Sequence, residues 1–517
     1  KMKQALALEI MLSGENVFLT GAAGSGKTFT LNQFIKLAKN SGKKVSVTAT
    51  TGLAATHLGG NTIHAWSGIG IYDYLSKKFF EKIPKTRAEI IKNTDILVID
   101  EISMLHDFRL DMVEEICRTI RQNDKPFGGI QVILCGDFFQ LPPINRNGSR
   151  TGGFAIHSEA WRLADFTVCY LEENYRQKDS ELTEILNALR ADDLRRKHAE
   201  SLLNRVDAEP EFENEDFSKN LTELHTTNID VDKINEQKLA ELEGKEFHFA
   251  QTTTGAKNYV ETLQKSVLAP ELLRLKKGAL VMAVKNAQNR QYVNGSIGEV
   301  IDFETLTDYP IVQFQNGKVV TMVPDTWEMR DGERKRASIM QIPLRLAYAI
   351  TVHKSQGMTL DAARIDLRKA FAEGMGYVAL SRVRSLDRLY LIGINRMALV
   401  VSEEAQKIDT RLKNESQKAE KRFAHLLETA KKREAGEIIE KAPAKTTWAQ
   451  KLEKMREEFP NAYRPWKLSD DARLQEAIFE NGKIDEALIL KLSKELGRHK
   501  GSIEARIKKL FGEDSLQ

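Results

Sequence analysis

The chain has 517 residues, of which 41% are hydrophobic and 29% charged, and its formal net charge is +4. This length allows several domains of about 100–200 residues each, and no apolar run approaches the roughly 20 residues that a membrane-spanning helix needs. The mild positive charge suits a nucleic-acid partner, although local charge decides binding. The scattered Cys117, Cys135 and Cys169 form no CxxC pair, so we expect core thiols in a reducing compartment rather than disulfides or metal ligands.

Short β-rich runs alternate with helical stretches from residue 16 to residue 171. Nearly continuous apolar strands separated by helices indicate a parallel sheet that is covered on both faces. A second α/β region begins near residue 175 and returns after an interruption. The predicted strands are 16–20, 45–50, 95–100, 131–135 and 167–171 in the first region, and 346–350, 363–367 and 388–392 in the second.

The interruption, residues 279–323, reads as short strands with turns at Asn294-Gly295 and Asn316-Gly317. Asn-Gly is the strongest short hairpin signal, so we expect a small β-barrel or sheet here. Residues 402–441 are dense in Lys, Glu and Ala and predict a long solvated helix, with a coiled-coil partner as the weaker alternative. Residues 463–511 regain apolar periodicity and predict a small three-helix domain.

Residues 21–28 (GAAGSGKT) have the spacing of a phosphate-binding loop and lie between a predicted strand and a predicted helix. Glycines let backbone N–H groups face phosphates, and the helix N-terminus adds partial positive charge. We expect Gly24, Ser25 and Gly26 to hold the phosphates, Lys27 to reach the β- and γ-phosphates, and the Thr28 hydroxyl to bind Mg²⁺. The loop therefore predicts ATP as ligand, with Mg²⁺ as its cofactor.

Residues 95–101 (DILVIDE) form an apolar strand that ends in two carboxylates, beside the phosphate loop at the carboxyl edge of the sheet. We expect Asp100 to hold the magnesium and Glu101 to orient and deprotonate the attacking water. Gln140, in the run 136–143 (GDFFQLPP), is placed to sense the γ-phosphate or that water. Asp137 could equally be a turn residue that satisfies backbone donors.

Read in order, these motifs resemble those of superfamily 1 DNA helicases, and residues 110–129 with 136–143 resemble the signature of the PIF (petite integration frequency) family. The match continues through 48–52 with 62–66, then 174–177, 351–359 and 377–382. It covers roughly residues 1–399. RecD-like helicases share much of the pattern, but the 110–129 segment favours the PIF branch.

The resemblance implies an α/β fold with two RecA-like parallel-sheet motor domains, a small inserted β-barrel and a helical C-terminal domain. The expected boundaries are 1–174 for the first motor domain, 175–278 and 344–400 for the second, 279–343 for the insert, 401–441 for a charged helical linker and 442–517 for the C-terminal domain. It also implies that Gln4 recognises adenine, that Arg176 and Arg382 contact the γ-phosphate, and that the loop with Gly357 touches nucleotide. Arg382 could otherwise form a structural salt bridge on its helix.

Single-stranded DNA should cross the tops of both motor domains, gripped by small polar, basic and aromatic groups. His353 alone would more often be a core histidine, and the basic loop 330–336 could be a solvated turn. His157 and Trp161 resemble a motif that packs beneath the DNA-facing loops. The expected DNA-binding residues are Thr50, Gly52, His64 and Trp66 in the first domain, Asn228, Thr351, His353 and Lys354 in the second, and Asn294 and Gly295 in the insert.

The C-terminal segment resembles a helix-turn-helix or Myb-like module, with Arg506, Lys508 and Lys509 on its last helix. It could hold duplex DNA or bind a protein client, since acidic residues offset the basic ones.

The resemblance implies an ATP-dependent helicase that moves 5′-to-3′ on single-stranded DNA and unwinds forked or duplex DNA in replication, repair, recombination or telomere maintenance. An ATPase that remodels protein–DNA complexes would carry the same motifs. Residues 1–4 lack the layout of a secretory signal, although a targeting segment could precede them. The compact layout favours a bacterial cytoplasmic protein that is nucleoid-associated when bound to DNA.

Overall fold

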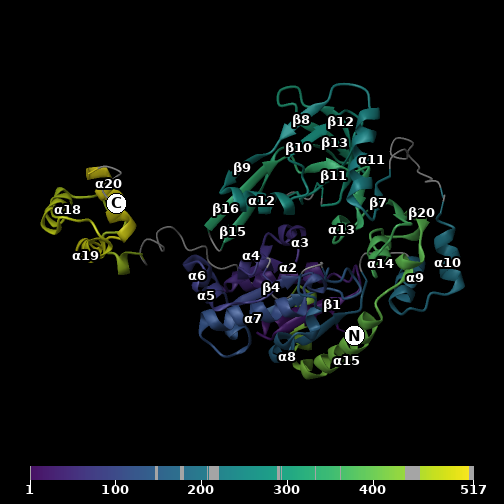
Figure 1. Ribbon diagram of the computed structural model, residues 1–517, viewed down its shortest axis with the longest axis horizontal. Helices are drawn as coiled ribbons and strands as arrows, with labels where there is room; N and C mark the ends of the chain where they lie inside the picture. The colour runs from purple at the N-terminus through teal and green to yellow at the C-terminus, as the bar shows by residue number, and fades with distance from the viewer. Residues whose placement is uncertain are drawn as a thin grey trace. The chain divides into compact units, whose positions relative to one another are not determined.

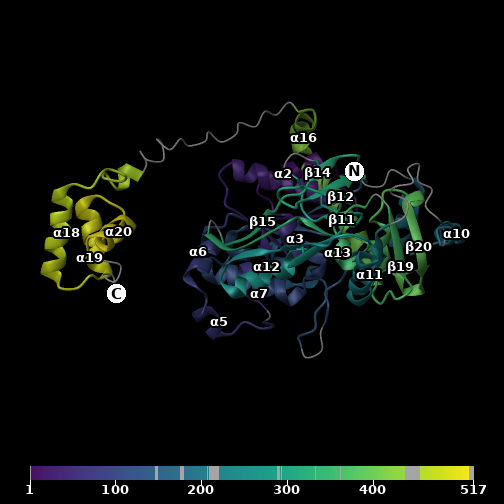
Figure 2. The same cartoon turned by 90° about the horizontal axis from the view of Figure 1, so that it is seen from above.

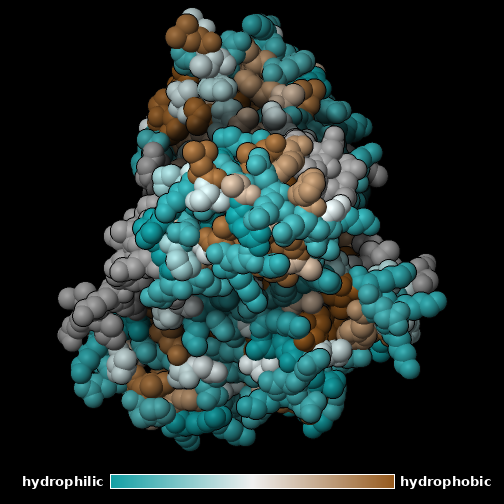
Figure 3. All heavy atoms as spheres, turned by 90° about the vertical axis from the view of Figure 1, so that its left-hand side faces the viewer, coloured by the Kyte–Doolittle hydropathy of each residue, from teal (hydrophilic) through white to brown (hydrophobic). Residues whose placement is uncertain are grey.

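The computed structural model describes residues 2–70, 72–145, 149–174, 180–206, 208, 221–287, 291–292, 294–331, 334–360, 362–436 and 455–511. The chain divides into two compact units, Lys1–Ile438 and Ile439–Gln517, and each is described by itself. In the described ranges, no helix combines the length and the apolarity needed to cross a membrane. The face shown in Figure 3 is mostly hydrophilic, with hydrophobic atoms in separate groups.

The first α/β domain is built on a six-stranded parallel sheet in the order β3-β2-β4-β5-β1-β6. This arrangement confirms the predicted parallel sheet and its five predicted strands within one residue of their bounds. The two-residue strand β3 was too short to predict. The strands are β1 (Val17–Gly21), β2 (Val45–Ala49), β3 (Asn61–Thr62), β4 (Ile96–Asp100), β5 (Gln131–Cys135) and β6 (Thr167–Leu171).

Helices cover both faces of this sheet, as Figure 1 shows for α2, α7 and α8. Alternate strand residues face opposite sides, so Leu19 and Val98 pack with α1 and α2, whereas Phe18 and Ile99 pack with α7. The helices of this domain are α1 (Gln4–Leu12), α2 (Lys27–Asn40), α3 (Gly52–His57), α4 (Ile63–Ser67), α5 (Lys77–Glu81), α6 (Lys85–Asn93), α7 (Asp107–Arg121) and α8 (Glu159–Ala164).

The second α/β domain has a four-stranded parallel sheet in the order β18-β7-β19-β20. Its strands are β7 (Glu223–His225), β18 (Ala349–Thr351), β19 (Ala363–Leu367) and β20 (Leu389–Ile394). Its helices are α9 (Ser180–Arg190), α10 (Arg196–Leu203), α11 (Asn228–Glu241), α13 (Val352–Ser355) and α14 (Met375–Leu380). The chain enters this domain between β6 and α9 and leaves it after β20.

The helix α15 (Glu403–Arg422) lies in the segment predicted to be a solvated, charged linker. It is not a solvated linker, because it packs against β6 of the first domain. One stripe of the helix is buried there, and the Ser416 hydroxyl accepts a hydrogen bond from the Tyr170 backbone N–H at 3.0 Å. The stripe was missed because it is narrow and made partly of small residues within a strongly charged sequence. Its buried members are Ala405, Ile408, Leu412, Ser416 and Ala419. After α16 (Leu427–Glu434), described residues of this unit end at 436.

The insert is larger than the predicted 279–343. It begins after α11, because β9 pairs with β16 and β8 pairs with β10, both antiparallel. Its main sheet has the order β14-β13-β12-β11-β17, and the predicted Asn316-Gly317 hairpin joins β13 to β14. Figure 2 shows β11, β12 and β14 close together. The elements are β8 (Phe247–Ala250), β9 (Thr252–Gly255), α12 (Lys257–Ser266), β10 (Leu272–Leu275), β11 (Leu280–Ala283), β12 (Ile297–Phe303), β13 (Pro310–Phe314), β14 (Val319–Thr321), β15 (Asp325–Asp331), β16 (Arg334–Gln341) and β17 (Leu344–Leu346).

Within the described residues of the second unit, the helices α18 (Leu468–Asn481), α19 (Glu486–Leu496) and α20 (Lys500–Phe511) pack around a small apolar core. Arg506, one of the basic residues noted on the last helix, makes contacts within the unit. It donates to both carboxylate oxygens of Asp471, at 2.8 and 2.6 Å, and lies 5.3 Å from the ring centre of Trp466. Arg498 is 3% exposed and donates to three backbone carbonyls.

Candidate active site and nucleic-acid interface

The phosphate loop joins β1 to α2 at the carboxyl edge of the first sheet. Gly26 caps α2 in the left-handed region (φ 82°), a conformation that glycine adopts without strain. The loop borders a cavity of about 410 Å³ that also receives residues from the second domain. The lining residues are Ala23, Gly24, Gly26, Lys27, Thr28, Phe29, Glu101, Gln140, Gly357, Thr359, Arg382 and Arg384.

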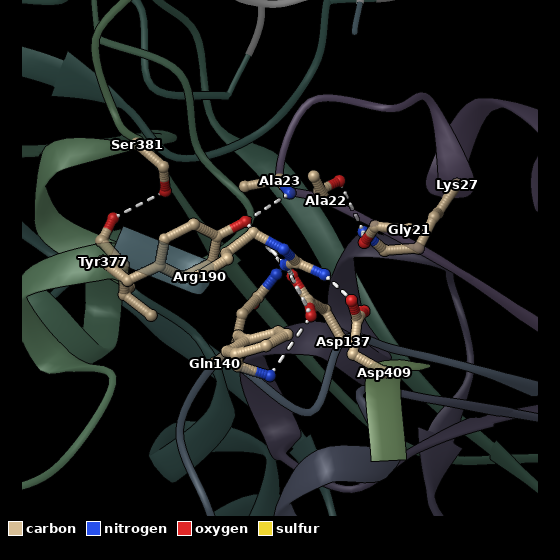
Figure 4. Close-up of polar contacts among 12 residues, drawn as sticks. Gly21, Ala22, Ala23, Lys27, Asp137, Gln140, Arg190, Tyr377, Ser381 and Asp409 are labelled. Carbon is tan, nitrogen blue, oxygen red and sulfur yellow. Dashed lines mark hydrogen bonds and ion pairs between the residues drawn. The ribbon is translucent and has the colours of Figure 1, made fainter. Parts of the chain in front are cut away.

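Lys27 folds back on its own loop. Its Nζ donates to the carbonyl oxygens of Gly21 at 2.8 Å and Ala22 at 3.0 Å (Figure 4). Burial lowers the pKa of Lys27, while the nearby Asp137 carboxylate raises it. The Ser25 hydroxyl is buried and has no hydrogen-bond partner among the described residues. The loop therefore places the Lys27 cation beside the cavity, which suits a phosphate.

Asp100 ends β4, and Glu101, which follows it, lines the same cavity. Glu101 has a left-handed backbone (φ 54°), which is uncommon outside glycine and typical of functional sites. Burial raises the pKa of Asp100. Burial, reinforced by the adjacent Asp100 charge, raises the pKa of Glu101 to about 7. A carboxyl with such a pKa can accept a proton near neutral pH.

Gln356 connects the two domains at this point. Its Nε2 donates to Glu101 Oε2 at 2.9 Å and to Gln140 Oε1 at 3.0 Å. Both acceptors lie more than 200 positions before Gln356 in the chain. Sequence reasoning placed the loop around Gln356 near nucleotide but gave this side chain no role. Its signal was present in the 351–359 motif.

Arg382 also lines the cavity and is 1% exposed. Its guanidinium donates to the carbonyls of Ser355 at 3.2 Å and Met358 at 3.1 Å, so it also holds the loop that contains Gly357. Arg176, the other expected arginine, lies outside the described residues. The exposed Arg384 lines the cavity and was not predicted.

Gln4 lies beside the phosphate loop, where its Nε2 donates to the Ser25 carbonyl at 3.2 Å. Phe29, which is 58% exposed, also lines the cavity and offers a flat apolar surface. Thr359 completes the second domain's side. Sequence reasoning gave no role to Phe29, which follows the phosphate loop, or to Thr359, which ends the 351–359 motif.

Two of the expected DNA contacts in the first domain are buried instead. Trp66 is 5% exposed within the main core. The Thr50 hydroxyl donates to the Glu101 carbonyl at 2.8 Å, so this residue holds the segment that follows β4. Gly52 packs against the insert, since a Cβ there would lie 2.4 Å from Ser266 Cβ. His64 is partly buried; desolvation and nearby Arg109 lower its pKa to about 4, so it is neutral at physiological pH.

In the second domain the expected residues divide similarly. Thr351 is 4% exposed and caps α13 by accepting from the Lys354 N–H, whereas Asn228 is exposed at the N-terminus of α11. Burial lowers the pKa values of His353 and Lys354, whose side chains are only partly buried. The His353 ring lies nearly parallel to Phe371 with centres 6.3 Å apart, and Phe371 is 63% exposed. Phe371 was missed because it lies outside every recognised motif.

The insert approaches the cavity through Asn294-Gly295, beside Thr359. Gly295 (φ 92°) donates its N–H to Ala283 at 2.8 Å, and a Cβ on it would lie 3.3 Å from the Thr359 carbonyl. This pair is therefore a junction between the insert and the cavity rather than the tip of a hairpin. Within the basic loop 330–336, residues 332 and 333 lie outside the described residues.

Trp161 has the expected core role, at 5% exposure with its ring 4.9 Å from that of Phe18. His157, at 49% side-chain exposure, instead pairs with Glu404 at the start of α15 at 2.5 Å. Both residues therefore support the first domain and its contact with α15.

Comparison with known proteins matches residues 2–194 to the PIF1-like helicase family model and residues 258–303 to the 2B domain of DNA helicase Pif1. The chain is 42% identical over 484 residues to ATP-dependent DNA helicase Pif1 of Psychrobacter sp., covering 82% of this chain and 72% of that protein. Bacteroides sp. Pif1 in complex with ADP-AlF4 is similar with a TM-score of 0.68 at 31% identity, over 80% of this chain and 96% of that one. Bacteroides Pif1 bound to ssDNA is similar with a TM-score of 0.56 at 31% sequence identity, over 79% of this chain and 96% of that one. The chain belongs to the PIF1-like helicase family and has its RecA-like α/β fold.

Proposed function

We propose that this protein is an ATP-dependent DNA helicase that moves 5′-to-3′ along single-stranded DNA and opens forked or duplex DNA. The observation that carries the proposal is the cavity shared by both α/β domains, where Gln356 bridges Glu101 and Gln140. A site built from two domains assembles fully only when they close, so ATP binding can drive movement. The ATP-dependent relatives and the ssDNA complex support the same conclusion.

In this proposal, Lys27 and the loop N–H groups hold the phosphates, with Gly24, Ser25 and Gly26 shaping the loop. Glu101 accepts the proton of the attacking water, and Gln140 orients that water together with Gln356. Arg382, with Arg176 as predicted from sequence, stabilises the charge that develops on the transferred phosphoryl group. Gln4 and Phe29 would hold adenine, and Gly357 lets its loop approach the phosphates.

Thr28 and Asp100 fit a magnesium ion, because both offer oxygen ligands, which Mg²⁺ prefers in combination with substrate phosphates and water. Among the described residues, no group of three His, Cys, Asp or Glu side chains could hold a metal by itself. That agrees with an ion held largely by substrate. When bound, Mg²⁺ would neutralise phosphate charge.

For the DNA track we propose His64, Asn228, His353 and Lys354 as contacts, and we add Phe371 as a stacking platform. Thr50, Gly52, Trp66 and Thr351 are assigned to support of the surrounding loops, and Asn294 with Gly295 to the junction between insert and cavity. We propose that the sheets of the insert form a barrel-like domain that covers the bound single-stranded DNA.

The helical second unit would bind duplex DNA or a protein client, using Lys508 and Lys509 rather than Arg506. The bacterial relatives support a cytoplasmic, nucleoid-associated location.

The deciding experiment measures ATP hydrolysis with and without single-stranded DNA, using Lys27→Ala and Glu101→Gln as controls. We expect strong stimulation by DNA that both variants lose. ATP turnover that ignores DNA would refute the proposal. Unwinding of forked duplexes with a 5′ or a 3′ tail then tests direction, and stimulated turnover without strand separation would favour the remodelling ATPase.

A further inference from the structure

A buried polar network connects the phosphate loop to the second α/β domain and to α15 (Figure 4). At its centre is Arg190, the last residue of α9, which is 7% exposed. Its Nη1 donates to Asp137 Oδ1 and Oδ2 at 2.9 and 2.7 Å and to the Tyr377 hydroxyl at 3.0 Å. Its Nη2 donates to the Tyr170 hydroxyl at 2.9 Å and to Asp409 at 3.0 Å.

Tyr377 carries the network to the phosphate loop. Its hydroxyl accepts the Ala23 backbone N–H at 2.9 Å and lies 3.3 Å from Asp137 Oδ2. A phenol has one proton and two lone pairs, so Ala23, Arg190 and Asp137 use its full capacity. Tyr377 is 1% exposed, and water has no access to replace a lost partner.

The charges of the network balance. Arg190 faces Asp137 and Asp409, and Lys413 supplies the second positive charge at 2.8 Å from Asp409 Oδ2. Arg190 also lies over the Phe139 ring, 4.1 Å from its centre. A buried ion pair that lost one partner would leave an uncompensated charge, so the network favours one arrangement of its elements.

The ends of the network stand next to the groups assigned to ATP chemistry. Asp137 precedes Gln140 by three residues, Ala23 precedes Lys27 by four, and Tyr377 precedes Arg382 by five. We propose that Arg190, Tyr377 and Asp409 are positioning residues that hold the phosphate loop, Gln140 and Arg382 in register for ATP turnover and tie that register to α15. This inference rests on the proposed ATP-driven function.

The test uses Tyr377→Phe, which keeps the ring and removes the hydroxyl, with Tyr390→Phe as the matched control. Tyr390 is also buried in the second domain beside an arginine, at β20, and belongs to no part of the network. We expect Tyr377→Phe to lower the DNA-stimulated kcat about tenfold, with KM for ATP changed less than about threefold, because Lys27 and the loop N–H groups still bind phosphate.

Two further variants decide between positioning and simple structural support. Arg190→Lys should also lower kcat. The double variant with Tyr377→Phe should have a kcat no lower than that of the slower single variant, because both substitutions break the same network. Asp409→Asn, which preserves shape, should lower kcat about threefold or more if α15 is coupled to the site. Losses that multiply, or a Tyr377→Phe rate within twofold of wild type, would overturn the proposal.

An unchanged Asp409→Asn rate would remove α15 from the proposal. If the wild-type protein hydrolysed ATP without responding to DNA, the helicase assignment would fail by itself. The same kcat, KM and double-variant comparison would then be made on the basal turnover, and would still decide the positioning roles.

Discussion

Turnover should depend on pH through Glu101, whose pKa is raised to about 7 by burial and by the neighbouring Asp100. Only the ionised carboxylate accepts a proton, and its fraction is about one in eleven at pH 6 and about ten in eleven at pH 8. The DNA-saturated kcat should therefore rise about tenfold between these values. The assay is steady-state ATP hydrolysis from pH 5.5 to 8.5 at saturating ATP and DNA.

Gln356 makes this prediction specific. Its hydrogen bond to Glu101 stabilises the ionised form and so lowers the pKa that burial raises. Gln356→Leu should move the midpoint of the profile to higher pH as well as lower the rate. Gln237→Leu, on the exposed face of α11, is the control and should leave the midpoint in place. A flat profile, or a midpoint that stays fixed in Gln356→Leu, would refute the role given to Glu101.

The same shift has a consequence for stability. The folded protein binds this proton more tightly than the unfolded chain, whose carboxyl has a pKa near 4.5. The free energy of unfolding therefore falls as pH rises from 4.5 to about 7 and then stays at the lower value. Without nucleotide, Glu101→Gln should raise the melting temperature at pH 8 and leave it nearly unchanged at pH 4.5.

Three other predictions address the helix α15, the DNA track and the second unit. Leu412→Ala should lower the free energy of unfolding by about 2–5 kcal/mol in denaturant titrations, whereas the exposed Leu427→Ala should change it little; equal effects would contradict the packing of α15. Phe371→Ala should weaken single-stranded DNA binding by about 1–3 kcal/mol in fluorescence anisotropy, and Phe479→Ala, in the second unit, is its exposed control. Removal of residues 439–517 should leave DNA-stimulated ATP hydrolysis intact, because the first unit has its own cores; its loss would show that the second unit is required.

Local signals predicted much of the first domain and the residues that gather at its candidate nucleotide site. The phosphate loop and Asp100-Glu101 each combine a short motif with an apolar strand, and both are complete within a few residues. The Gln356 bridge and the Arg190 network could not be found that way. Their partners come from segments far apart in the chain, and Arg190 ends an ordinary amphipathic helix.

Burial separated residues that the motifs grouped together. Trp66 and His64 belong to one motif, yet the indole is in the core and the imidazole is only partly buried. Helical periodicity would have indicated this difference only with a longer helix than α4, which has five residues. Likewise, a threonine such as Thr351 is typical of a helix N-cap as well as of a DNA contact. In the structure it is the N-cap of the short helix α13.

The return of α15 to the first sheet limits the ways in which the two α/β domains can move. The polypeptide passes between them twice, once between β6 and α9 and once between β20 and α15. A single tether would permit twisting about its own direction, whereas two separated tethers leave mainly one rotational degree of freedom, opening about the line that joins them. For the proposed motor, we therefore expect domain closure to be mainly a rotation of this kind.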